Sequence, residues 1–180
     1  HLGNSWILRD LHTLDLSGFQ LFTPKGLGAV LLSSKIGTLE RLRVQMRPSD
    51  SRLATIFERA RALDTLKELW LRASMSGEVA TLVLSKLRSK QIETLDLQGN
   101  QGTASTMIAL ARAPFAPALK HLNLADNPIG DRGVEALAKS PMWPRHLDLS
   151  RAKLGDKGLK TLLSTQAFHL VETLVIAGND

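Results

Sequence analysis

One short phrase that opens on a leucine or a similar residue recurs seven times along the chain, and this repetition restricts the possible folds more than any other feature. The phrases start at positions 11, 39, 66, 92, 119, 144 and 171, so the gaps between them are 28, 27, 26, 27, 25 and 27 residues. The first phrase reads LHTLDLSG and the fourth reads IETLDLQG. A unit of this size cannot bury its own apolar face, so neighbouring units must stack on one another. The spacing therefore predicts a solenoid.

Each repeat joins a strand pattern to a helix pattern. In the fifth phrase, Leu122 and Leu124 are expected to point inward, while His121 and Asn123 alternate outward as in a β-strand. The segments between phrases carry apolar residues at helical spacing, which predicts helices over residues 24–34, 50–62, 76–89, 103–113, 131–140 and 156–165. Asp131 is expected to cap the fifth helix. Right-handed crossovers between parallel strands then place the helices outside a curved sheet.

The seven phrases resemble the leucine-rich repeat, LxxLxLxxN, over essentially the whole chain. The Gly130-Asp-Arg-Gly133 segment, its counterpart from Gly155 to Gly158 and a period near 27 residues resemble the ribonuclease-inhibitor-like subclass. The resemblance implies an α/β fold, a leucine-rich repeat solenoid that forms a curved right-handed superhelix with parallel strands on its concave face and helices on its convex face. It also implies a single domain over residues 1–180 with about seven strands and six helices.

The family places an asparagine at the ninth position of the phrase, where it hydrogen-bonds backbone groups in the turn. Three repeats of this chain have it, at Asn100, Asn127 and Asn179. The other four repeats carry different residues there, namely Phe19, Arg47, Ser74 and Ala152. The absence of this asparagine from four repeats does not change the predicted fold, but it predicts less regular curvature around residues 39–75.

Composition excludes several kinds of site. The chain has no cysteine, so neither disulfides nor thiolate metal sites are possible. No stretch of 18 or more apolar residues occurs, and residues 1–10 lack the pattern of a signal peptide. These features favour a cytoplasmic protein. Because the chain starts without methionine and stops directly after a strand phrase, we expect a fragment of a longer solenoid, whose uncapped repeats could associate end to end.

The outward residues of the strands form the candidate binding surface. The third, fifth and seventh positions of each phrase are expected to line the concave face, and Trp70 is the only large aromatic residue among them. Arginines surround it, with Arg41 and Arg43 on the neighbouring strand and Arg72 on its own. Tryptophan and arginine are typical of interface hot spots. The alternative is that Trp70 only shields its neighbours while the arginines pair with two bordering carboxylates, Glu68 and Asp96.

A second group combines His121 and His146 with Asp96, Asn123 and Asp148. Imidazoles and carboxylates together could bind a transition metal or perform acid–base chemistry. On a gently curved open sheet, however, such side chains point apart, and nothing excludes water from them. We therefore expect no metal, no cofactor and no enzymatic activity, and we interpret the group as polar surface.

The sequence predicts a non-enzymatic scaffold that binds another protein through the concave face, centred on Trp70. The predicted contact residues are Arg41, Arg43, Glu68, Trp70, Arg72, Asp96, His121, Asn123, His146 and Asp148. The alternative is binding of nucleic acid or another acidic surface, because residues 1–90 hold 14 Lys and Arg against 8 Asp and Glu, whereas residues 91–180 hold 9 of each. The basic residues behind this alternative are Arg41, Arg43, Arg47, Arg52, Arg59, Arg61 and Arg72. Several of them fall on a predicted helix away from the concave face, and aromatic residues that could stack on bases are few, so we do not expect nucleic acid to be the partner.

Overall fold

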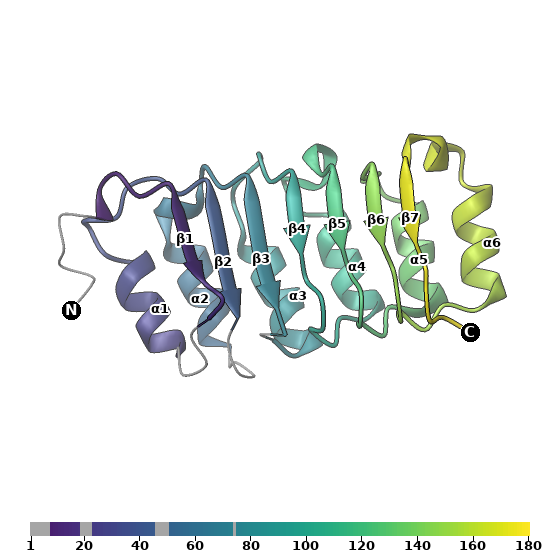
Figure 1. Ribbon diagram of the computed structural model, residues 1–180, viewed down its shortest axis with the longest axis horizontal. Helices are drawn as coiled ribbons and strands as arrows, with labels where there is room; N and C mark the ends of the chain where they lie inside the picture. The colour runs from purple at the N-terminus through teal and green to yellow at the C-terminus, as the bar shows by residue number, and fades with distance from the viewer. Residues whose placement is uncertain (1–7, 19–22, 46–50, 74) are drawn as a thin grey trace.

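The seven phrases form one parallel sheet whose strands follow one another in sequence order (Figure 1). The computed structural model describes residues 8–18, 23–45, 51–73 and 75–180. The strands are β1 (Thr13–Leu16), β2 (Arg41–Gln45), β3 (Glu68–Arg72), β4 (Thr94–Asp96), β5 (His121–Asn123), β6 (His146–Asp148) and β7 (Thr173–Val175). Each strand begins two positions after the start of its phrase, so the repeat itself sets the register of the sheet.

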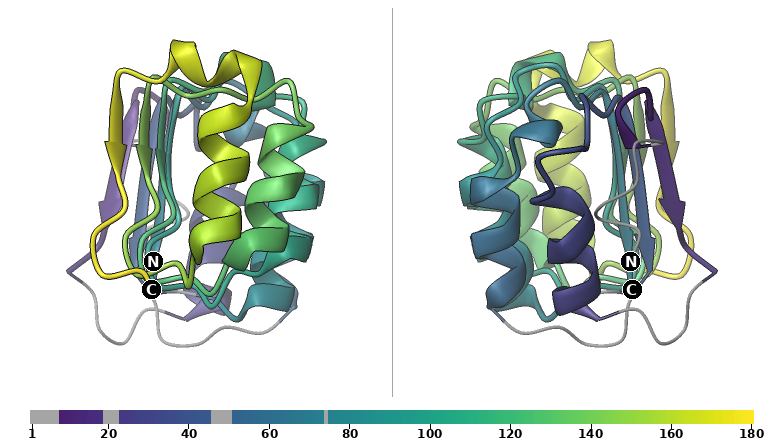
Figure 2. Two further views of the ribbon diagram at one scale, coloured as in Figure 1. Left: turned by 90° about the vertical axis from the view of Figure 1, so that its right-hand side faces the viewer. Right: turned by 90° about the vertical axis from the view of Figure 1, so that its left-hand side faces the viewer.

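Helices alternate with the strands and cover one face of the sheet. They are α1 (Pro24–Leu31), α2 (Arg52–Arg59), α3 (Gly77–Lys86), α4 (Ala104–Ala111), α5 (Gly130–Ala138) and α6 (Asp156–Ser164), with short 3₁₀ turns at η3 (Arg61–Leu63), η4 (Ala116–Ala118) and η5 (Gln166–Leu170). Figure 2 shows the two layers end-on, with the helices all on one side of the strands. The predicted α/β solenoid is confirmed. We call the uncovered side of the sheet the open face.

The core between the layers is a continuous aliphatic strip. The fourth residue of every phrase is a leucine, and the strand register pairs these leucines side by side across the sheet. This leucine spine consists of Leu14, Leu42, Leu69, Leu95, Leu122, Leu147 and Leu174. Its five inner members are buried, and helix residues such as Leu27, Val83 and Leu137 close the strip from the other side. Each repeat therefore buries its apolar face only against its neighbours.

Two asparagines at the ninth position of the phrase are buried and tie adjacent turns together. The Asn127 Oδ1 accepts hydrogen bonds from the backbone N–H groups of Asn100 at 3.0 Å and Gly102 at 2.7 Å. Its Nδ2 donates to the carbonyl oxygens of Leu97 at 2.9 Å and of Leu124 and Ala125 at 3.0 Å. The Asn100 side chain makes the same kind of links, accepting from the Met75 N–H at 2.9 Å.

Of the other ninth positions, Ala152 lacks such a side chain, whereas Asn179 has one. Ala152 is buried, and its carbonyl oxygen accepts a hydrogen bond from the Gly130 N–H at 2.9 Å. The positions of Phe19, Arg47 and Ser74 lie outside the described residues. At the last repeat, the Asn179 Oδ1 accepts from the N–H groups of Ala152 at 2.8 Å and Leu154 at 3.1 Å.

The predicted cap of α5 is wrong. The helix begins at Gly130, and Asp131 lies inside its first turn. The Asp131 Oδ1 instead accepts a hydrogen bond from the backbone N–H of Gly155 in the next repeat, at 2.9 Å. This contact needs a glycine at position 158, because a Cβ there would overlap the Asp131 carboxylate. The Gly-x-x-Gly segment therefore serves repeat-to-repeat packing.

The predicted helices extend beyond the observed ones, chiefly at their C-terminal ends. The segment predicted over residues 76–89 is helical only over Gly77–Lys86. Leu87 has extended backbone but is buried, so its apolar character continues the helical spacing without continuing the helix. Periodicity does not distinguish a buried loop residue from the last helical turn.

Candidate functional site

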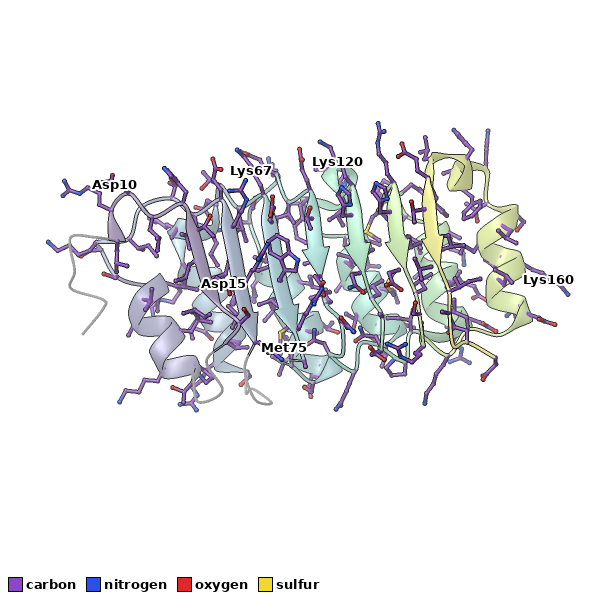
Figure 3. All side chains as sticks on the ribbon, in the orientation of Figure 1. Asp10, Asp15, Lys67, Met75, Lys120 and Lys160 are labelled. Atoms are coloured by element: carbon purple, nitrogen blue, oxygen red, sulfur yellow. The ribbon has the colours of Figure 1, made fainter. Side chains whose placement is uncertain are left out.

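All ten predicted contact residues lie on strands whose outward side chains form the open face, which is turned toward the viewer in Figure 3. The register aligns two rows across the sheet. One row contains Arg41, Glu68, Thr94, His121, His146 and Thr173, and the other contains Arg43, Trp70, Asp96, Asn123, Asp148 and Val175. Arg72 follows on β3. Because neighbouring strands lie roughly 4.8 Å apart, adjacent members of a row are close enough to contact each other.

Trp70 is half-buried and is held by an arginine on its neighbouring strand. The Arg43 Cζ lies 4.2 Å from the centroid of the Trp70 ring, a cation–π contact. The Arg43 Nη1 also lies 3.5 Å from the Asp15 Oδ2 on β1. The guanidinium therefore contacts both the Asp15 carboxylate and the Trp70 indole.

Every arginine around Trp70 has a carboxylate partner. The Arg41 Nε lies 3.1 Å from the Glu68 Oε1, and the Arg72 Nη2 lies 2.5 Å from the Asp96 Oδ2. The hydrogen bond to Asp96 raises the pKa of Arg72. With the Arg43–Asp15 pair, three positive charges face three negative ones. The cluster is electrically balanced, unlike the basic patch that the arginines alone suggested.

Asp96 departs from the expectation that it is exposed on the face. It is only 3% exposed, because its carboxylate lies beneath longer neighbours. Its Oδ2 accepts hydrogen bonds from the Arg72 Nε at 2.8 Å and the Asn123 Nδ2 at 3.1 Å, and its Oδ1 accepts one from the Gln98 N–H at 3.1 Å. Asp96 therefore positions Arg72 and Asn123 and presents almost no surface of its own. The alternation of inward and outward residues along a strand predicts on which side of the sheet Asp96 lies, but it does not predict that neighbouring side chains cover its carboxylate.

Trp70 stands between two hollows in the open face. The first, of about 230 Å³, extends from Trp70 across β4, β5 and β6 to Val175 on β7, which is 39% exposed. The second, of about 400 Å³, is more polar and is bordered by Arg43, Gln45 and Arg72. Sequence reasoning did not single out Thr94, Thr173 or Val175, which also line the first hollow. All three occupy the third or fifth position of their phrases, and this position in the sequence could have identified them as lining residues.

The two histidines that line the first hollow form a stacked pair. The ring centroids of His121 and His146 are 4.4 Å apart with an interplanar angle of 8°. In this arrangement the ring nitrogens lie in parallel planes and do not converge on one point. Across the described ranges of the chain, no group of three or more His, Cys, Asp or Glu side chains is placed to hold a metal ion. The pair contributes flat, weakly polar surface to the hollow.

The pKa of His121 is expected to make the stability of the fold depend on pH. Burial, followed by the adjacent His146, lowers the pKa of His121. In the unfolded chain, His121 is therefore protonated as the pH falls through the ordinary histidine pKa of about 6.5. In the folded chain, the same imidazole is protonated only at a lower pH. We expect the free energy of unfolding to fall as pH drops below about 6.5, and we expect this fall to be smaller in His121→Gln.

Urea denaturation at about pH 8 and at about pH 5.5, on either side of that value, measures this effect. His12→Gln is the matched control, because His12 is exposed on the segment before β1 and forms no ring stack among the described residues. A pH dependence identical in His121→Gln and in the unchanged chain would contradict the assignment.

Comparison with known proteins identifies part of the chain. A family model described as Leucine Rich repeat matches residues 117–138 and 145–163, which include β5, α5 and β6 and most of α6. No curated protein matches the sequence. The match does not address the ribonuclease-inhibitor-like subclass, which stays a prediction. No helix in the described part of the chain is long and apolar enough to cross a membrane.

Proposed function

Because this chain is a leucine-rich repeat protein, we propose that it is a non-enzymatic scaffold that binds another protein with the open face of its sheet, centred on Trp70. Leucine-rich repeat domains generally mediate protein–protein interaction. The single observation that supports the open face most strongly is the position of Trp70, held against Arg43 and bordered by a hollow on each side.

Binding energy at protein interfaces concentrates on a few large side chains that are packed around and desolvated on association. Trp70 satisfies the geometric requirement, because partner side chains that enter both hollows would enclose the indole. The Arg43 contact and the hydrogen bonds beneath Arg72 hold the surface in one arrangement. Such preorganisation lowers the entropic cost of association.

The charge balance indicates what kind of partner fits. Because the arginines around Trp70 are each opposed by a carboxylate, the centre favours a partner with mixed polar and apolar side chains over a strongly acidic one. Nucleic acid binding, the alternative, needs unneutralised cations along a track. Three of the arginines behind that alternative lie on α2 and η3, away from the open face, and Arg47 lies outside the described residues.

The experiment is site-specific photo-crosslinking in a lysate of the native host. A benzophenone side chain at Gln45 or Thr173, which line the two hollows that Trp70 also lines, is expected to capture the partner. The same group at Leu82 on α3 or Leu163 on α6, both exposed on the helix side, is expected to leave it uncaptured. Capture only from the helix side would contradict the proposal.

We expect Trp70→Ala to weaken binding of the captured partner by at least about tenfold, since truncating a central anchor removes most of its contact area. Titration calorimetry with the purified partner measures the change, and circular dichroism checks that the fold is intact. Leu163→Ala, which removes an exposed apolar side chain from α6, is the matched control and is expected to bind within about twofold of the unchanged chain. If Trp70→Ala and the unchanged chain bound the partner with equal affinity, Trp70 would not be part of the interface.

A further inference from the structure

We propose that the helix layer carries a second binding site, a groove between α4 and α5 that takes an acidic segment of a protein chain with an apolar side chain among its carboxylates. The two helices are neighbours in the layer (Figure 1). The hollow between them has a volume of about 480 Å³. It lies on the face opposite to Trp70, so it is independent of the function proposed above.

Small side chains create the groove. Ala111 on α4 and Ala136 on α5 both line it, and both are only partly buried. Ile108, one helical turn before Ala111, also lines it and is 43% exposed, which is high for an isoleucine. The middle of the groove is therefore apolar and open to a partner's side chain.

Cations surround this apolar middle. Arg112, Arg132 and Lys139 line the groove, and none of them forms an ion pair with a carboxylate of the described residues. The one carboxylate of the groove, Glu135, is already bound, since its Oε1 lies 2.8 Å from the Lys157 Nζ. Lys157, with smaller contributions from Lys139 and Arg132, lowers the pKa of Glu135. The groove thus has an excess of positive charge.

This excess is local. Residues 91–180 contain equal numbers of basic and acidic residues. Of the other six cations in this half, four are paired with carboxylates on adjacent repeats, in Lys120–Glu93, Arg145–Glu172, Arg151–Asp126 and Lys157–Glu135. The remaining two, Lys153 and Lys160, form no ion pair among the described residues and do not line the groove. Three cations without such partners therefore gather around one apolar hollow, and charge complementarity selects an acidic occupant.

The positions of the cations set the length of the segment. Arg132 lies in the first turn of α5, whereas Lys139 follows its last turn and Arg112 follows the last turn of α4. Lys139 is seven positions after Arg132, which corresponds to a rise of roughly 10 Å along the helix axis. An extended peptide covers this distance with about three residues, so acidic residues on either side of one apolar residue match the groove. The groove lining contains no aromatic side chain that could stack on a nucleic-acid base.

The test uses a fluorescein-labelled peptide, Gly-Ser-Glu-Asp-Leu-Asp-Glu-Ser-Gly, and fluorescence anisotropy at low and at physiological salt. We expect binding that weakens with salt. The double variant R132Q/K139Q is expected to weaken it by about tenfold or more, because each substitution removes one charge-assisted contact. The matched control K153Q/K160Q removes the same charge from exposed positions outside the groove and is expected to bind within about twofold. Lys160 is marked on α6 in Figure 3.

Two further measurements test whether the apolar middle of the groove contributes to binding and whether the peptide binds away from the open face. Replacing the peptide's leucine by serine is expected to weaken binding severalfold if the apolar middle takes part. Trp70→Ala is expected to leave peptide binding unchanged, which separates this site from the open face. The proposal is overturned if the peptide does not bind, if both double variants weaken it equally, if Trp70→Ala abolishes binding, or if a single-stranded oligonucleotide of equal charge binds more tightly.

Discussion

Replacing Asn127 with alanine is expected to lower the free energy of unfolding by about 3–5 kcal/mol. The Asn127 side chain accepts two backbone N–H groups and donates to three carbonyl oxygens, all in buried turns of adjacent repeats. A methyl group satisfies none of them, and each buried polar group left without a partner costs about 1–3 kcal/mol, with less than additive sums. Urea denaturation followed by circular dichroism measures the loss.

Asn179→Ala is the matched control for this prediction. Asn179 makes the corresponding contacts in the last repeat, accepting from two N–H groups and donating to the carbonyl oxygens of Leu149 and Ile176. Its turn is only partly buried, so water replaces some of the lost hydrogen bonds and the cost is expected to be smaller. Equal costs for the two variants, or a cost under about 1 kcal/mol for Asn127→Ala, would show that these asparagines do not hold the repeats together.

Truncating the leucine spine at its buried centre is expected to have the next largest effect. Leu122 is 2% exposed and is paired in register with Leu95 and Leu147 on the adjacent strands. Leu122→Ala removes three carbon atoms and leaves a cavity that the rigid sheet cannot close, so we expect a loss of about 3 kcal/mol in the free energy of unfolding. The same urea titration measures it.

Leu174→Ala tests whether the cost depends on stacking between repeats. Leu174 holds the same place in its phrase but lies in β7, where β6 is its one neighbouring strand within the described sheet, and it is only partly buried. Its truncation is expected to cost less than that of Leu122. If Leu174→Ala proved as costly as Leu122→Ala, the one-dimensional account of the core, in which each repeat is stabilised by its two neighbours, would be wrong.

The fold was predictable because its signal is repeated seven times. Alternation within each phrase identified the strands, and the fixed position of Leu122 and its equivalents set both the register and the inward side. The outward residues followed from the same alternation, which is why Trp70, His121 and His146 appear where the sequence predicted them. A single phrase would not have distinguished a strand from a short buried helix.

The contacts between outward residues were not predictable, since they depend on the lengths and rotamers of side chains on different repeats. Asp96 illustrates this: its place in the row was correct, but its burial beneath Arg72 and Asn123 required three-dimensional geometry. The same holds for Asp131, whose carboxylate binds a backbone N–H of the next repeat and does not cap its own helix. Local sequence rules describe a residue's own repeat, while these contacts cross between repeats.

Thiol labelling tests most directly the claim that the open face is the surface on which a protein partner docks. The natural chain has no cysteine, so single cysteines at Gln45 or Thr173 on the open face, and at Leu82 or Leu163 on the helix side, give unambiguous labelling rates. With the crosslinked partner purified and added back, we predict slower labelling at both open-face positions and unchanged labelling at both helix-side positions. Slower labelling at the helix side alone, with the open face still freely labelled, would contradict the account.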